Sequence, residues 1–180
     1  MKPTVFCSVL SLALYSLAAH AATPESKALY DQTRAAAAAQ YKADHAQCRT
    51  LAGNARDVCE AEAKARQVRA EEDAGAQYKN TLDAYTKARM RIASANYDLD
   101  RAKCGALGGN DKDVCLAQAK ATRVAAEADA KADEKAFEAR QDARDDKRTA
   151  QYKVALEKCD AFAGAVKDNC VSTAKAQYGK

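Results

Sequence analysis

The sequence predicts an all-α fold made of elongated antiparallel helical hairpins, and three observations lead to this expectation. Alanine, the residue with the highest helix propensity, supplies 45 of the 180 residues. Both prolines stand near the start of the chain, at positions 3 and 24, so none interrupts the rest. Six of the seven cysteines lie in three copies of one motif, which indicates a scaffold of stapled units.

The motif reads Tyr-x6-Cys-x2-(Leu/Phe)-x-Gly-x2-(Lys/Arg)-Asp-x-Cys-x3-Ala-Lys-Ala and begins at Tyr41, Tyr97 and Tyr152. The repeat units are therefore about 41–65, 97–121 and 152–176, spaced by 56 and then 55 residues.

Each repeat unit is expected to contain a chain reversal. On one continuous helix Cys48 and Cys59 would lie ~16 Å apart at ~1.5 Å per residue, whereas a disulfide needs Cα atoms ~5.5 Å apart. A glycine lies between the cysteines of every unit, at positions Gly53, Gly109 and Gly164. Six cysteines formally allow fifteen connectivities. We expect the local pairs Cys48 with Cys59, Cys104 with Cys115 and Cys159 with Cys170.

Residues around the glycines suggest how each tip is capped. The glycine is expected to be a left-handed C-cap of the incoming helix. Asn54 and Asn110 would cap the returning helix, with Asp57 and Asp113 adding negative charge to its first turn. The third unit has Ala165 at the asparagine position, so its tip is expected to be the least well capped.

Helices running unbroken from tip to tip would be ~80 Å long. Pairing Cys104 with Cys115 would place Leu99 opposite Ala121 and Ala95 opposite Val124, so that large residues face small ones. The stripe expected to form this seam comprises Tyr85, Ala88, Ile92, Ala95, Leu99 and Ala102. Laid antiparallel, such helices give up to four at one end and a two-stranded coiled coil toward the Gly109 tip. The segment from Gly75 to Asn80 is the one place where a helix could break.

The first residues have the pattern of a secretory signal peptide. A basic residue at position 2, an apolar run over 5–17 and the sequence Ala19-His20-Ala21 predict residues 1–21 as the signal, cleaved after Ala21. The domain that remains, 22–180, is expected to be a single elongated helical repeat domain. No later stretch approaches ~20 apolar residues, so no integral membrane segment is expected in the mature chain. Six cysteines in a secreted chain favour disulfides and a periplasmic location.

Charge and motif content disfavour most other classes of function. Loss of Lys2 leaves 28 basic and 25 acidic residues, a net charge of +3 that is too weak to indicate a nucleic acid partner. His45 lies three residues before Cys48, but two candidate ligands do not make a zinc site. Neither a nucleophilic triad nor a phosphate-binding glycine loop occurs. We expect no catalytic residue, no cofactor and no metal, and hence not an enzyme.

One segment has the pattern of a docking helix. Between residues 131 and 150 a helical wheel gathers alanines into one wedge with acidic residues on one flank and basic residues on the other. The candidate docking face consists of Ala136, Ala139, Ala143, Arg140, Arg144, Glu138 and Asp142. Its partner would be either the chain's own helices or another protein, and the alternative interpretation is a solvated charged helix.

The repeated Cys-x2-Leu-x-Gly-x2-(Lys/Arg)-Asp-x-Cys-x3-Ala-Lys-Ala units, from Tyr41 to Ala176, resemble those of uncharacterised secreted or periplasmic proteobacterial proteins. Some of those proteins are labelled TolA-like cell-envelope proteins. The resemblance implies an envelope location and no particular activity.

The sequence therefore favours a non-catalytic periplasmic structural or interaction protein of the cell envelope, which self-associates or binds a protein partner through helical seams. A periplasmic stress-protective chaperone or amphiphile-binding protein is the alternative.

Overall fold

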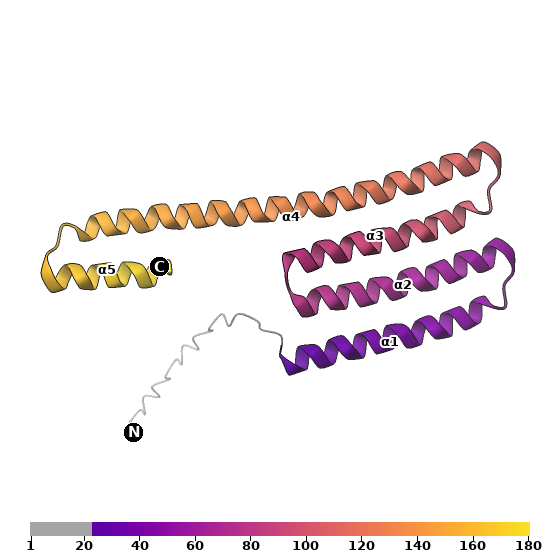
Figure 1. Ribbon diagram of the computed structural model, residues 1–180, viewed down its shortest axis with the longest axis horizontal. Coiled ribbons are helices and arrows are strands. Elements are labelled where there is room, and N and C mark those ends of the chain that lie inside the picture. Colours follow the sequence, from indigo (N-terminus) through magenta and orange to yellow (C-terminus); the bar gives the residue numbers. More distant parts are fainter. Residues whose placement is uncertain (1–22) are drawn as a thin grey trace, which may run out of the picture.

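The computed structural model describes residues 23–180 and is all-helical over that range (Figure 1). The predicted signal peptide lies outside the described residues. In chain order the helices are α1 (Pro24–Cys48), α2 (Gly53–Lys79), α3 (Leu82–Cys104), α4 (Gly109–Cys159) and α5 (Gly164–Tyr178). Helix α1 begins at Pro24 because the preceding residue caps it. Thr23 Oγ1 accepts a hydrogen bond from the Ser26 amide at 3.2 Å, and Pro24 occupies the first turn, where no amide donor is needed.

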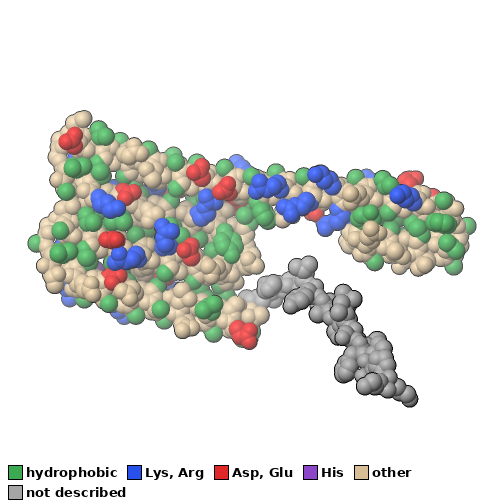
Figure 2. Space-filling view, turned by 180° about the vertical axis from the view of Figure 1, so that it is seen from behind, with side chains coloured by type: hydrophobic (Ala, Val, Ile, Leu, Met, Phe, Trp, Pro, Cys, Tyr) green, Lys and Arg blue, Asp and Glu red, His purple; other side chains and the backbone are tan. Residues whose placement is uncertain are grey.

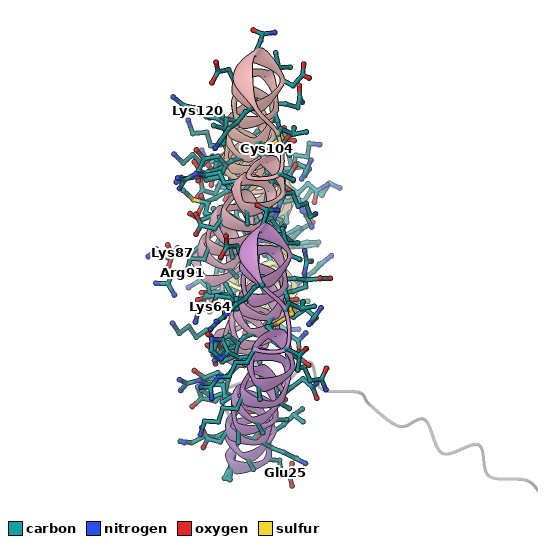
Figure 3. The ribbon with its side chains drawn as sticks, turned by 90° about the vertical axis from the view of Figure 1, so that its right-hand side faces the viewer. Glu25, Lys64, Lys87, Arg91, Cys104 and Lys120 are labelled. Carbon is teal, nitrogen blue, oxygen red and sulfur yellow. A yellow bond between two sulfur atoms is a disulfide. The ribbon has the colours of Figure 1, made fainter. Side chains whose placement is uncertain are left out.

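The helices form a single antiparallel layer. Each described helix contacts only its neighbours along the chain, in the pairs α1 with α2, α2 with α3, α3 with α4, and α4 with α5. Seen end-on, α1 to α4 stack in one column, with α1 and α4 at its two edges (Figures 1 and 3). A single layer leaves both of its faces and both of its edges open.

The three expected disulfides are confirmed. Cys48–Cys59, Cys104–Cys115 and Cys159–Cys170 have Cα–Cα distances of 5.6, 5.7 and 5.6 Å. Each bond joins the last turn of one helix to the first two turns of the next, so the chain reverses three times beside a cystine. These disulfides fit an oxidising compartment outside the cytoplasm. Within residues 23–180 the structure contains no helix with the length and apolar character needed to cross a bilayer.

The chain breaks in the segment from Gly75 to Asn80, where the sequence allowed a break, and runs unbroken through the second interval. The 51 residues of α4 form one helix, whereas the chain reverses between α2 and α3. Gly75 lies inside α2, and the reversal begins at Asn80, which has φ 48° and donates its amide to the Ala76 carbonyl at 2.8 Å. Thr81 then caps α3 by accepting from the Ala84 amide at 3.2 Å. Asparagine tolerates the left-handed region better than most residues, so the reversal occurs there.

This reversal changes the expected arrangement of the tips. The Gly53 and Gly109 tips lie at the same end of the layer, and the Gly164 tip lies at the far end of α4 (Figure 1). The expected two-stranded end at Gly109 is therefore wrong, because the isolated helix pair is α4 with α5.

The capping scheme predicted for the tips also needs correction. All three tip glycines have positive φ, between 53° and 58°, but each is the first residue of the returning helix and not a C-cap of the incoming one. Neither Asn54 nor Asn110 is an N-cap, because the N-cap positions are Ala52, Gly108 and Ala163, none with a side-chain hydrogen bond. Capping thus does not distinguish the third tip.

The core consists almost entirely of alanine and cystine. Among the described residues the largest side chains with almost no exposure are Cys48, Cys104 and Cys159. Buried alanines let the helices approach closely, and the disulfides compensate for the small apolar area, as expected of a scaffold without large aliphatic residues inside.

The seam expected between α3 and α4 is wrong in its helical phase. Val124 is 55% exposed and Ala121 is also exposed, so neither packs beneath α3. The residues of α4 that pack against α3 lie on the same side of the helix as Cys115, and they include the buried Ala119 and Ala130. On α3, the stripe that contains Ala95 faces α2. The disulfide fixes this phase, since only residues on the cysteine's own side of a helix can meet its partner.

Candidate interaction surface

The middle of α4 has no helix beside it. The last ion pair between α3 and α4 joins Arg89 Nη1 to Asp133 Oδ2 at 2.7 Å. The end of the chain returns only as far as Thr149, whose Oγ1 accepts from Lys180 Nζ at 3.1 Å. Residues 134–148 therefore bridge two packed regions as a single helix (Figure 1).

The predicted docking face lies on this stretch and is exposed. All seven of its residues are exposed, namely Ala136, Glu138, Ala139, Arg140, Asp142, Ala143 and Arg144. At ~100° per residue its alanines lie roughly opposite Ala119, Ala130 and Cys159, the buried side of α4. The alanines of the face therefore point away from α3 and α5. None of the described helices covers the face.

Charged groups on this face are available for intermolecular contacts. Glu138 and Asp142 form no ion pair with any other residue of 23–180, and Arg144 donates from Nε to the Arg140 carbonyl at 3.3 Å. The adjacent pair of Arg148 with Asp145 lies outside the face. From behind, Lys and Arg side chains are prominent along the bare part of α4 (Figure 2). A partner with interleaved opposite charges would therefore meet unpaired groups there.

Phe137 is the one large apolar residue in the bare stretch and is 40% exposed. Phe137 lies about two turns after the buried Ala130 and on the same side of α4, which is the side that α3 covers at Ala130. Neither the repeat nor the charge pattern of the sequence marks Phe137, although a lone aromatic residue among charged ones is a signal for this side of the helix.

An open groove follows the terminal hairpin of α4 and α5. It has a volume of about 750 Å³ and is lined by residues including Val154, Ala155, Ala174 and Tyr178, beside the Cys159–Cys170 bond. Val154 is 55% exposed.

His45 has ordinary structural surroundings. Its Nε2 lies 3.8 Å from Glu60 Oε1, its ring lies against Tyr41 at 5.6 Å between centroids, and the nearby Cys48 sulfur is in a disulfide. Among residues 23–180 no three histidine, cysteine, aspartate or glutamate side chains are gathered as metal ligands would be.

Asp44 and Glu60 stabilise the first hairpin through charged contacts. Asp44 accepts hydrogen bonds from Gln40 at 2.8 Å and from Arg66 at 3.0 Å, and these lower the pKa of its carboxyl group. A hydrogen bond from Arg56 similarly lowers the pKa of Glu60. Both contacts lie on a packed hairpin, so we assign them to the structure of the protein.

The three repeated tyrosines are half-buried at the seams. The Tyr41 ring lies 5.4 Å from Lys64 Nζ, and the Tyr97 ring has Arg123 Cζ at 5.5 Å. Tyr152 approaches Tyr178 with ring centroids 6.1 Å apart. Each ring thus packs across its own hairpin, where stacking and cation–π contacts add to the small buried area.

No family model matches the chain, and neither the curated proteins nor the solved structures include a significant match to it.

Proposed function

We propose that the chain is a non-catalytic helical structural and interaction protein of the bacterial periplasm. In this proposal the stapled layer at one end and the stapled hairpin at the other hold the middle of α4 apart as a rigid docking rod. The observation that carries the proposal is the bare stretch 134–148, in which a face of alanines and charges has no partner among residues 23–180.

Rigidity supports this interpretation. The two ends of the bare stretch continue into packed hairpins, α3 with α4 on one side and α4 with α5 on the other, each closed by a disulfide. A helix held at both ends loses little conformational entropy when a partner helix binds, so more of the contact energy appears as affinity.

Site-specific photo-crosslinking in cells tests the proposal. A photoreactive residue at Ala139 should capture an envelope protein of defined mass after irradiation. Lys87, exposed on α3, is the matched control position and should capture much less. Equal or absent capture at both positions would reject a docking role for the rod.

The groove between α4 and α5 is the one observation that favours the second candidate, a chaperone or amphiphile-binding protein. This candidate requires the purified protein to suppress aggregation of an unfolded client at near-stoichiometric ratios. It also requires Val154→Glu, which places a charge in the groove, to abolish the suppression. Absence of suppression by the wild-type protein would eliminate it.

A further inference from the structure

The first half of α4 repeats the sequence of α2 at an offset of 56 residues. The match includes the alternating small and branched residues of one helical face. The equivalent pairs are Val58 with Val114, Ala61 with Ala117, Ala65 with Ala121, Val68 with Val124, and Ala76 with Ala132. The same kind of contact surface is therefore present twice in the chain.

On α2 this surface is covered by α3. Ala65 is 7% exposed and Ala76 is 3% exposed. Val68 lines a common groove with Ala95 of α3, and Arg91 of α3 donates to Glu72 at 2.9 Å. The α2 surface thus shows what its repeated copy on α4 is suited to bind.

On α4 the repeated surface has no partner. Val114 is 59% exposed and Val124 is 55% exposed, and Ala121 and Ala132 are exposed as well. The reason is topological, because α4 is the last helix of the layer and its inner side is used by α3 (Figure 1). Val114 and Val124 belong to one contiguous small-residue face with Ala117, Ala121 and Ala132, whereas the equivalent Val58 and Val68 on α2 are half-buried, so the α4 copy of the surface is suited to a neighbour.

The complementary surface is exposed at the opposite edge of the same molecule. The stripe of α3 that faces α2 has its repeat equivalent on the outer side of α1. The equivalent pairs are Ala84 with Ala28, Ile92 with Ala36, Ala95 with Ala39, Leu99 with Ala43, and Ala102 with Ala46. All five α1 residues are exposed.

We propose that the outer face of α4 in one molecule binds the outer face of α1 in a second copy, repeating the α2–α3 interface between molecules. The inference deepens the proposed interaction function, on which it rests, by naming a second copy of the chain as a partner. The two surfaces differ, so the contact is head-to-tail and the single helical layer continues from one molecule to the next.

The residues at the centre of the transferred contact are compatible in size. Transferring the α2–α3 register places Val124 opposite Ala39 of the second copy, as Val68 and Ala95 line one groove. Lys64 and Asp98 of that groove become Lys120 and Lys42, so salt that screens these two lysines should favour association. The ion pair of Glu72 with Arg91 becomes a contact between Ala128 and Ala35. Such a contact between small residues permits close helix approach.

One tip contact differs. Asn54 lies against Gly105, but the equivalents are Asn110 and Arg49, whose β-carbon leaves less room. The intermolecular interface therefore begins about one turn away from the tips.

The test uses sedimentation velocity on the oxidised mature chain and on variants at exposed positions. Wild-type protein should show a weight-average mass that rises with concentration past that of a dimer. Val124→Glu and Ala39→Glu should each remain monomeric, because each removes one of the two faces. Val166→Glu, on α5 at a position 60% exposed and outside both faces, is the control and should associate like wild type.

Mixing the variants separates a head-to-tail contact from a symmetric one. The Val124→Glu variant has an intact α1 face, and the Ala39→Glu variant has an intact α4 face. These two faces can bind each other, but the second face of each variant is blocked, so the mixture should form a 1:1 dimer and nothing larger. A symmetric α4–α4 contact would leave Ala39→Glu able to dimerise alone. That result, or wild-type protein that stays monomeric at millimolar concentration, overturns the inference.

The two proposals fail separately. Capture of a different envelope protein at Ala139 by a monomeric wild-type chain would keep the docking function and reject self-association. Circular dichroism of each variant, expected to match wild type, shows that the charge acts on association and not on folding.

Discussion

The side-chain amide of Asn54, at the start of α2, lies against the backbone of Gly105, at the end of α3, in the space where a β-carbon would stand. This contact joins the first two hairpin tips, which belong to different repeats and lie at the same end of the layer. It depends on glycine at position 105.

Gly105→Ala is expected to destabilise the protein by about 1 kcal/mol, because the new methyl group displaces Asn54. The backbone there has φ −61°, which alanine tolerates, so the cost comes from close contacts of the β-carbon with Asn54 Oδ1 and with the Ala102 carbonyl oxygen at 2.9 Å. Gly108→Ala is the matched control, since a β-carbon at Gly108 meets nothing within 4 Å. Equal unfolding free energies for the two variants in urea would contradict the proposed tip contact.

The glycines at 53 and 75 are expected to respond to alanine in opposite directions. Gly53 has φ 55°, where an L-residue is strained, so Gly53→Ala should lower the unfolding free energy by about 1–2 kcal/mol. Gly75 lies inside α2, and its β-carbon would meet Tyr30 Cε2 at an ordinary 3.8 Å. Gly75→Ala should raise the unfolding free energy by up to about 1 kcal/mol. Thermal unfolding of both variants checks the signs, and a stabilised Gly53→Ala would contradict the left-handed tip.

The terminal hairpin is expected to depend most on its disulfide. The 15-residue α5 contacts only α4, and the Cys159–Cys170 bond contributes roughly 3 kcal/mol by the loop-entropy model. Replacing both cysteines with alanine should abolish hydrogen-exchange protection in α5 and leave α2 protected. The same replacement at Cys48 and Cys59 is the comparison, because α2 keeps its contact with α3. Protection of α5 that survives without its disulfide would refute this view of the hairpin.

Acid should weaken the first hairpin through Asp44. Gln40 and Arg66 depress the pKa of this carboxyl in the folded chain, so its contribution is present above the ordinary carboxyl range of about 4 and is lost as pH falls below it. The melting temperature should therefore decrease between about pH 5 and pH 3. Asp44→Asn should lower the melting temperature at pH 7 and make its decline in acid shallower. Asp73→Asn, an exposed aspartate of α2, is the control, and an equal response of both variants would rule out this role for Asp44.

Local spacing predicted the parts of the fold that a few neighbouring residues decide. The separation of Cys48 from Cys59 and the glycine between them were sufficient to predict a stapled reversal with positive φ at Gly53. The place of that glycine was mistaken, because a helix can end several residues before a left-handed position as readily as at it.

Longer-range features could not be read in the same way. Asn80 could have produced either a kink or a full reversal. The reversal requires α3 to pack against α2, and that packing depends on contacts along the whole length of both helices. The phase of the α3–α4 seam was missed because Ala95 belongs to a second stripe of α3, directed toward α2. The candidate docking face was found by its charge pattern, whereas its isolation from α3 and α5 follows from the reversal and was visible only in the structure.

Three reversals of the chain, each held by a disulfide within one repeat, define the fold. Peptide mapping of protein isolated from its native compartment without reduction tests them most directly. It should recover the linked pairs Cys48–Cys59, Cys104–Cys115 and Cys159–Cys170 in full yield. Free thiols, or bonds between cysteines of different repeats, would contradict the layered arrangement and the outer faces derived from it.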